Sequence, residues 1–220
     1  MDEINIFHRE LLAEAQGDAD ASGVITSEAF LEKISEILDE AGEVSSLSQS
    51  YYEGKFRGKT LQVDAFSWDP LDEEGVLSVV ICDFVVDDEL QSIDRSEISR
   101  LLKKLVEFVV AAKTRDFRES LEEASDGFVL SDLIHRSWAK INKIKLIVVT
   151  NRVNKSRTDA QPVGSIASIP VTSNVWDLSR IYRFVSSGQT REDLIIDLIS
   201  RIKPAHSNAY VKFVDKKCKE

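Results

Sequence analysis

The sequence has few of the residues that build metal centres and disulfides. It contains two cysteines and three histidines in 220 residues. Cys82 stands in an apolar segment and Cys218 in the charged C-terminal tail, and neither the cysteines nor the histidines show the spacing of zinc ligands. We therefore expect two free thiols and no zinc site.

Motifs of nucleotide binding and serine hydrolysis are absent too. The sequence contains no P-loop, no GxGxxG segment and no GxSxG elbow. Its first ten residues lack the positive and apolar regions of a secretory signal, and no apolar run approaches the ~20 residues that span a bilayer. These absences predict a cytoplasmic protein without a membrane partner.

Basic residues are fewer than acidic ones, 28 against 38, which gives a formal net charge of -10. A net charge of this sign opposes the binding of a polyanion. One segment differs, because residues 135–157 contain no acidic residue. This strip is suited to contact nucleic-acid phosphates or an acidic partner surface, although a solvated helix end and loop gives the same pattern. The candidate nucleic-acid-binding residues are Arg136, Lys140, Lys143, Arg152, Lys155 and Arg157.

Composition and length favour one folded domain. Hydrophobic residues make up 43% of the chain and charged residues 30%, as in soluble globular proteins. We expect one domain over residues 1–215, followed by a charged tail at residues 216–220.

Periodicity predicts an α/β fold, with α+β as the alternative: a mixed central sheet flanked by helices. Helices are expected at residues 3–16, 26–41, 94–113, 116–123, 129–142 and 177–185. Thr26 and Asp177 are expected N-caps, Asp94 with Glu97 resembles a capping box, and Gly42 is placed to end the second helix. Strands are expected at residues 59–68, 76–86, 143–151, 163–171, 191–202 and 209–215. We interpret residues 45–58 as a loop or a short irregular strand.

The hairpin over residues 59–87 carries an aspartate in each of its strands, Asp64 and Asp83. Two neighbouring carboxylates repel each other, and a hard cation such as Mg²⁺ relieves the repulsion by taking them as ligands. Such an ion activates water for phosphodiester hydrolysis, so Asp64 and Asp83 are candidate catalytic residues. Glu43, with Glu40 as the other choice, would complete the metal site. The competing interpretation is that backbone or serine donors satisfy both strand carboxylates.

The order helix, strand with Asp, strand with Asp, helix resembles the core of the PD-(D/E)XK restriction-endonuclease-like superfamily. Two departures stand against catalysis: Val85 occupies the position of the expected lysine, and Val63 rather than proline precedes Asp64. Lys103 or Lys104 on the next helix is a candidate for a displaced lysine. The resemblance therefore leaves a metal-dependent nuclease and a degenerate, non-catalytic fold both open.

Five segments together resemble the N-terminal region of bacterial AIPR proteins, the abortive infection phage resistance family. They are FHRELLAEAQ, EAFLEKISEILDEAGEV, YYEGKFRGKTLQVDAFSWD, LSVVICDF and VWDLSRIYRFVSSG. The resemblance implies a bacterial anti-phage protein, and because such proteins are generally longer, it implies that this chain is their N-terminal domain.

Two functions follow as hypotheses. One is a nuclease-like domain that binds or cleaves nucleic acid during phage infection. The other is a non-enzymatic module that docks a protein partner, the C-terminal region of the same protein, or a second copy as a homo-oligomer.

Overall fold

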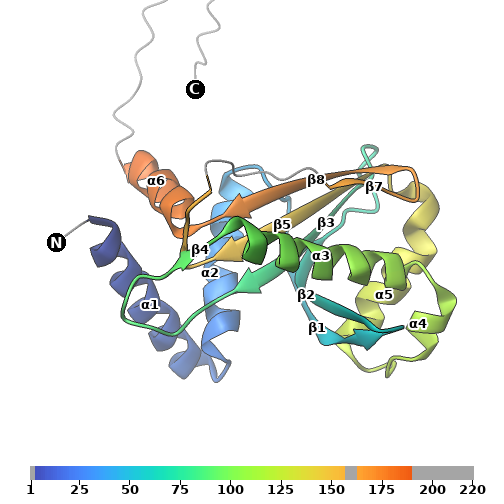
Figure 1. Cartoon of the computed structure of the whole chain (residues 1–220), viewed down its shortest axis with the longest axis horizontal. Helices are drawn as coiled ribbons and strands as arrows, with labels where there is room; N and C mark the ends of the chain where they lie inside the picture. The colour runs from blue at the N-terminus through green and yellow to red at the C-terminus, as the bar shows by residue number, and fades with distance from the viewer. Residues whose placement is uncertain (1–2, 157–162, 190–220) are drawn as a thin grey trace, which may run out of the picture. The chain divides into compact units, whose positions relative to one another are not determined.

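A six-stranded mixed sheet forms the centre of the computed structural model, which describes residues 3–156 and 163–189 (Figure 1). Its order is β1-β2-β3-β5-β8-β7, and β3, β5 and β8 run parallel to one another while the other pairs are antiparallel. The strands are β1 (Ser48–Phe56), β2 (Lys59–Ser67), β3 (Val76–Asp83), β5 (Lys143–Thr150), β7 (Gly164–Ile166) and β8 (Ile169–Trp176). A short parallel pair, β4 (Ser92–Ile93) and β6 (Val153–Asn154), lies apart from this sheet.

Helices cover both faces of the sheet, which explains why β3 and β5 are apolar on both sides. The helices are α1 (Glu3–Ser22), α2 (Thr26–Glu40), α3 (Arg95–Ala112), α4 (Arg115–Glu119), α5 (Asp126–Ser137), the 3₁₀ turn η1 (Trp138–Lys140) and α6 (Leu178–Gln189). One core joins the sheet to α3, α4 and α5, and a second joins it to α1, α2 and α6. In Figure 1, α3 crosses the face nearer the viewer. The predicted α/β fold with a mixed sheet and flanking helices is confirmed.

The hairpin of β2 and β3 is irregular at Asp64. The two strands pair only where Ala65–Ser67 lie opposite Ser78–Val80. Before that point, the Asp64 carboxylate accepts the backbone N–H of Cys82, at 2.8 Å from Oδ2. Leu61 and Val63 pack in the core beneath α3, whereas Ala65 packs in the core beneath α2, so the buried side chains change face at Asp64.

Several boundaries differ from the sequence predictions. The first helix continues past residue 17 to Ser22. Of the two alternatives for residues 45–58, the irregular strand is confirmed, because β1 spans Ser48–Phe56 and its register with β2 shifts between Gln49 and Tyr52. Thr26 is the first helical residue of α2 rather than its cap, because Ile25 takes the cap position without a side-chain bond. The predicted strand at 163–171 is two strands, β7 and β8, joined by a turn at Ala167 and Ser168, which have positive φ.

Other local predictions are confirmed. Asp94 and Glu97 form the predicted capping box of α3. Gly42 follows α2 with a φ of +68°, the left-handed conformation that ends helices. The predicted strands at 191–202 and 209–215, and the tail at 216–220, lie outside the described residues. Within the described part, no helix is long and apolar enough to cross a membrane.

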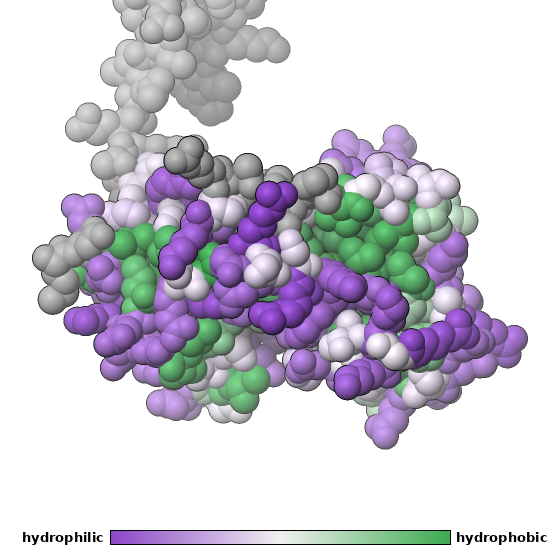
Figure 2. All heavy atoms as spheres, in the orientation of Figure 1, coloured by the Kyte–Doolittle hydropathy of each residue, from purple (hydrophilic) through white to green (hydrophobic). Residues whose placement is uncertain are grey.

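Hydrophilic and hydrophobic side chains divide the face shown in Figure 2. Hydrophilic groups cover most of it, and hydrophobic groups gather between α3 and the β7–β8 hairpin. Partly buried residues such as Val106 and Ile169 pack against the core beneath α3.

Candidate functional site

Asp83, the last residue of β3, is the centre of a polar network at the carboxyl ends of the parallel strands. Its Oδ2 accepts hydrogen bonds from Thr150 Oγ1 at 2.9 Å and from Arg152 Nε at 2.8 Å, and Arg152 Nη2 lies 2.8 Å away as well. The same guanidinium donates from Nη1 to Glu97 Oε1 at 3.0 Å. One arginine thus faces two carboxylates, and its side chain is only 12% exposed.

The local fold explains why these residues meet. Strands β3 and β5 are parallel and in register, with Asp83 opposite Thr150, so the residues that follow both strands share one edge of the sheet. Glu97 is the third residue of α3 and accepts the backbone N–H of Asp94, which fixes its position. This backbone bond, followed by the bond from Arg152, holds the pKa of Glu97 below its usual value. The network therefore supports an ionised Glu97 beside a permanently charged Arg152.

The loop that carries Arg152 is tied down on both sides. Buried Asn151 donates from Nδ2 to Val85 O at 2.7 Å and accepts from Val85 N at 3.0 Å. Asp177, 4% exposed, accepts from Asn154 N at 2.9 Å and from Arg180 N at 3.1 Å. Asp177 is thus the predicted cap of α6, and it also binds the loop after β5.

Asp64 lies in a different setting. Its Oδ2 accepts from Cys82 N and, at 3.4 Å, from Gln62 Nε2. Lys104 contacts this hairpin through Gln62, to whose Oε1 its ammonium donates at 2.7 Å, and it also lies 3.6 Å from Glu53 Oε1. Burial raises the pKa of Asp64 to about 6, although the Cys82 hydrogen bond acts in the opposite direction.

A pocket of about 390 Å³ opens beside Asp64, and we name it the Asp64 pocket. Alternate residues of three neighbouring strands form its floor, and α2 with the residue before it forms a wall. The floor residues are Gln49, Tyr51, Gln62, Asp64, Cys82 and Phe84, and the wall residues are Ile25, Ser27, Glu28 and Leu31; Asp126 of α5 completes the pocket.

Glu43 lies in a third environment, after the end of α2. Its carboxylate accepts from Asn174 Nδ2 at 2.7 Å, and its backbone oxygen accepts from Lys145 Nζ at 3.0 Å. Arg180 Nη2 is 3.9 Å from its Oε2. Glu43 therefore shares no hydrogen-bond or ion-pair partner with Asp64 or Asp83 among the described residues.

The three predicted metal ligands do not form one donor set. Among residues 3–156 and 163–189, no group of three or more acidic, histidine or cysteine side chains is placed to hold a metal ion. Asp83 Oδ2 already faces three donor atoms, two of them cationic. These residues do not fit Mg²⁺, because the ion would have to displace Arg152 and draw Asp64 from its backbone bond. A catalytic Mg²⁺ site stays a prediction.

The basic strip is divided between the two ends of β5. Lys140 and Lys143 lie before or at the start of the strand, and Lys155 lies after it. The strand has eight residues, so its ends are about 25 Å apart. Two other members of the strip already have acidic partners: Arg136 pairs with Asp132 at 2.9 Å, and Arg152 pairs with Asp83. Arg157 lies outside the described residues.

Sequence reasoning missed the pairing of Asp83 with Arg152. The sequence predicts Asp83 as a metal ligand and Arg152 as a phosphate contact, gives Glu97 a role only in the capping box of α3, and gives Thr150 none. A usable signal was present, because both buried strands were predicted and the carboxyl ends of parallel strands meet at one edge. The parallel pairing itself was not predicted.

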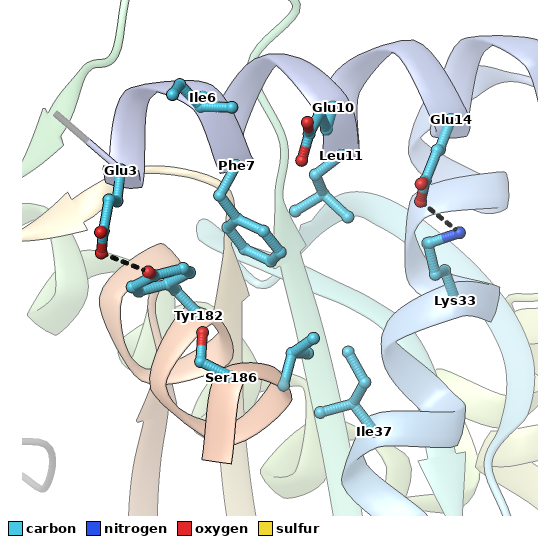
Figure 3. Close-up of a pocket in the computed structure, with 11 residues that line it drawn as sticks. Glu3, Ile6, Phe7, Glu10, Leu11, Glu14, Lys33, Ile37, Tyr182 and Ser186 are labelled. Carbon is cyan, nitrogen blue, oxygen red and sulfur yellow. Dashed lines mark hydrogen bonds and ion pairs between the residues drawn. The ribbon is translucent and has the colours of Figure 1, made fainter. Parts of the chain in front are cut away.

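A second groove, of about 420 Å³, lies between α1, α2 and α6 (Figure 3). Phe7, Leu11 and Ile37 form its apolar lining. Three of its charged groups have partners inside the groove: Glu3 accepts from the Tyr182 hydroxyl at 2.8 Å, and Lys33 lies 2.7 Å from a Glu14 oxygen. This groove contains none of the predicted site residues.

Comparison with protein families finds one match. A family model described as the abortive infection phage resistance protein N-terminal domain matches residues 30–183. These residues include Glu43, Asp64, Asp83 and the network around Arg152. No match is found among curated proteins or solved structures.

Proposed function

Because the chain belongs to the family of abortive infection phage resistance protein N-terminal domains, we propose that it is a catalytically degenerate, nuclease-like module that binds a protein partner in phage defence. The observation that carries this proposal is the contact of Arg152 with Asp83, which neutralises the carboxylate that a nuclease would use for its metal. We also place the protein in the cytoplasm.

The element order supports a nuclease-like origin. Helix α2, strands β2 and β3 and helix α3 follow the helix–strand–strand–helix order of the restriction-endonuclease-like resemblance, with β1 and the two-residue β4 as additional strands. Two groups that such a nuclease needs are not in place: Val85 stands where the lysine is expected, and Asp83 is bound by the Arg152 guanidinium. A fold that has lost a reaction but kept its surfaces is suited to binding.

A protein partner accords better with the charges than a nucleic acid does. The net charge is -10, and the basic residues predicted to contact phosphates are divided between two ends of a strand or engaged in ion pairs. Phosphate binding depends on several cations that act on one backbone path.

A second candidate is cleavage of nucleic acid at Asp64. It is favoured by Lys104, whose ammonium is linked to the Asp64 carboxylate through Gln62. In this alternative Lys104 would take the place of the absent lysine.

The test is a cleavage assay of the 220-residue chain on single- and double-stranded DNA and RNA with Mg²⁺ or Mn²⁺. We expect no cleavage above the buffer level by the wild type. The controls are Asp64→Asn, Asp83→Asn and Lys104→Met, each checked for folding by circular dichroism. Cleavage that persists in purified wild type and is lost in a folded Asp64→Asn or Lys104→Met variant would establish the second candidate and refute the first.

A further inference from the structure

The Asp64 pocket carries negative charge without a cation of its own. Glu28, Asp64 and Asp126 line it, and its lining includes no lysine or arginine among the described residues. The groove in Figure 3, by contrast, contains Lys33, which pairs with Glu14. In the cleft at Glu43, Lys145 supplies an ammonium. An unbalanced set of carboxylates favours a cationic occupant.

Only one of the two oxygens of the Asp64 carboxylate has a hydrogen-bond partner among the described residues. The hydrogen bonds from Cys82 N and from Gln62 Nε2 both go to Oδ2. No donor from the described part of the chain bonds to Oδ1. The bond to Cys82 fixes the carboxylate on the sheet, so a ligand would meet a positioned acceptor rather than a mobile side chain.

Aromatic and apolar side chains form the rest of the pocket. Phe84 is anchored by Phe30, with ring centroids 4.7 Å apart. The hydroxyl of Tyr51 donates to Glu53 Oε2 at 3.2 Å, which restrains the Tyr51 ring. Aromatic faces beside carboxylates bind guanidinium and ammonium groups, because the ring quadrupole attracts the cation and the apolar wall packs its aliphatic stem.

Two large side chains at the pocket are exposed to solvent. Ile25 is 62% exposed and Tyr51 is 56% exposed, and both line the pocket. A free amine would leave these side chains in water, whereas a polypeptide that inserts one side chain would cover them. Charge complementarity and this exposed apolar surface therefore favour a protein segment over a small cation.

We infer that the Asp64 pocket receives an arginine or lysine side chain from a protein partner, whose flanking apolar residues cover Ile25 and Tyr51. This inference rests on the proposed binding function and specifies its partner chemistry. The basic side chain ion-pairs with Asp64 Oδ1, and Glu28 and Asp126 add negative potential around it. Binding of this kind requires no reaction and no bound metal.

The experiment uses the 220-residue chain labelled with ¹⁵N and titrated with the model peptide acetyl-Gly-Leu-Arg-Leu-Gly-amide. We expect shifts of the backbone amides of Gln62, Asp64, Cys82 and Phe84. A lysine peptide should shift the same amides, and a peptide with glutamine in place of arginine should not. Asp64→Asn should weaken binding at least about tenfold, since it removes the charge but keeps an oxygen for Cys82.

The matched control is Glu36→Gln, which makes the same change of charge on the exposed surface of α2 and should leave binding unchanged. If both variants lost the same affinity for the peptide, binding would depend only on the net charge of the protein, and the inference would be overturned. So would the absence of Asp64-dependent shifts at millimolar peptide. If free arginine amide bound as tightly as the peptide, docking of a protein segment would be refuted. Failure of the cleavage prediction is a separate result, because that assay contains no peptide.

Discussion

Asp64 and Asp83 belong to one hairpin, but they lie in opposite electrostatic surroundings. Asp83 shares Arg152 with Glu97, and three donor atoms face its Oδ2. Asp64 accepts from a backbone amide and a glutamine, and burial raises its pKa to about 6. The first carboxylate is neutralised within the fold, whereas the second lines a pocket whose described lining holds no cation.

This difference shows that a strand carboxylate can bind a metal ion or a ligand only if no cation of the fold is already paired with it. Its position on the strand matters less. Both aspartates satisfy the spacing that suggested a metal site. An arginine already in place outcompetes a weakly held divalent ion, because guanidinium–carboxylate contacts are charge-assisted and are formed when the chain folds. The pairing of Asp83 with Arg152 therefore stabilises the fold, whereas Asp64 is the aspartate that a ligand would contact.

The largest expected loss of stability comes from removing Arg152, the cation that Asp83 and Glu97 share. Arg152→Ala leaves Asp83 and Glu97 facing each other without their shared cation, and we expect the free energy of unfolding to fall by about 3 kcal/mol. Urea denaturation at about pH 7 measures this change. The matched control is Arg136→Ala, whose exposed side chain pairs with Asp132, and its cost should be at most about 0.5 kcal/mol. Equal costs for the two arginines would contradict the distinction between a structural network and a surface pair.

Asp64→Asn should change the free energy of unfolding by a smaller amount, and the size of this change should depend on pH. The folded pKa of Asp64, about 6, lies above its ordinary value of 3.8, so the folded state binds more protons than the unfolded state between these values. Wild-type stability should therefore fall as pH rises from about 4 to about 6, by on the order of 2 kcal/mol from this group.

The asparagine of the Asp64→Asn variant cannot ionise, so the variant should lack this loss, and its stability relative to wild type should increase with pH. Glu28, Glu53, Asp126 and Lys104 surround the site in both proteins and cancel in the difference. Urea denaturation of both proteins at several pH values between about 4 and about 7 provides the measurement. Parallel stability curves would show that Asp64 is not destabilised by burial.

The sequence predicts the fold class and most elements because they depend on local patterns. The apolar run of β3, the stripe of α3 and the Asp94–Glu97 capping box each follow from residue type and spacing. At residues 45–58 the sequence leaves a loop and a short irregular strand open, because serines, glycines and tyrosines weaken the alternation, and the pairing of β1 with β2 decides for the strand.

The candidate site was less predictable, because its character depends on contacts distant in sequence. Asp83 and Arg152 are 69 residues apart, and they meet only because β3 and β5 are parallel and in register. The bond between Asp64 and Cys82 N depends on the short β2–β3 pairing, which no periodicity reveals. The aspartates were found from sequence, but their partners were not.

A double-mutant cycle tests most directly whether Arg152 pairs with the Asp83 carboxylate in the folded protein. The free energies of unfolding of wild type, Asp83→Asn, Arg152→Met and the double variant give the coupling energy between the two side chains. We predict a favourable coupling of about 2 kcal/mol or more, with the double variant less destabilised than the sum of the single variants. A coupling below about 0.5 kcal/mol, within the usual error of additivity, would contradict the claim and leave the Asp83 carboxylate free for a metal or substrate.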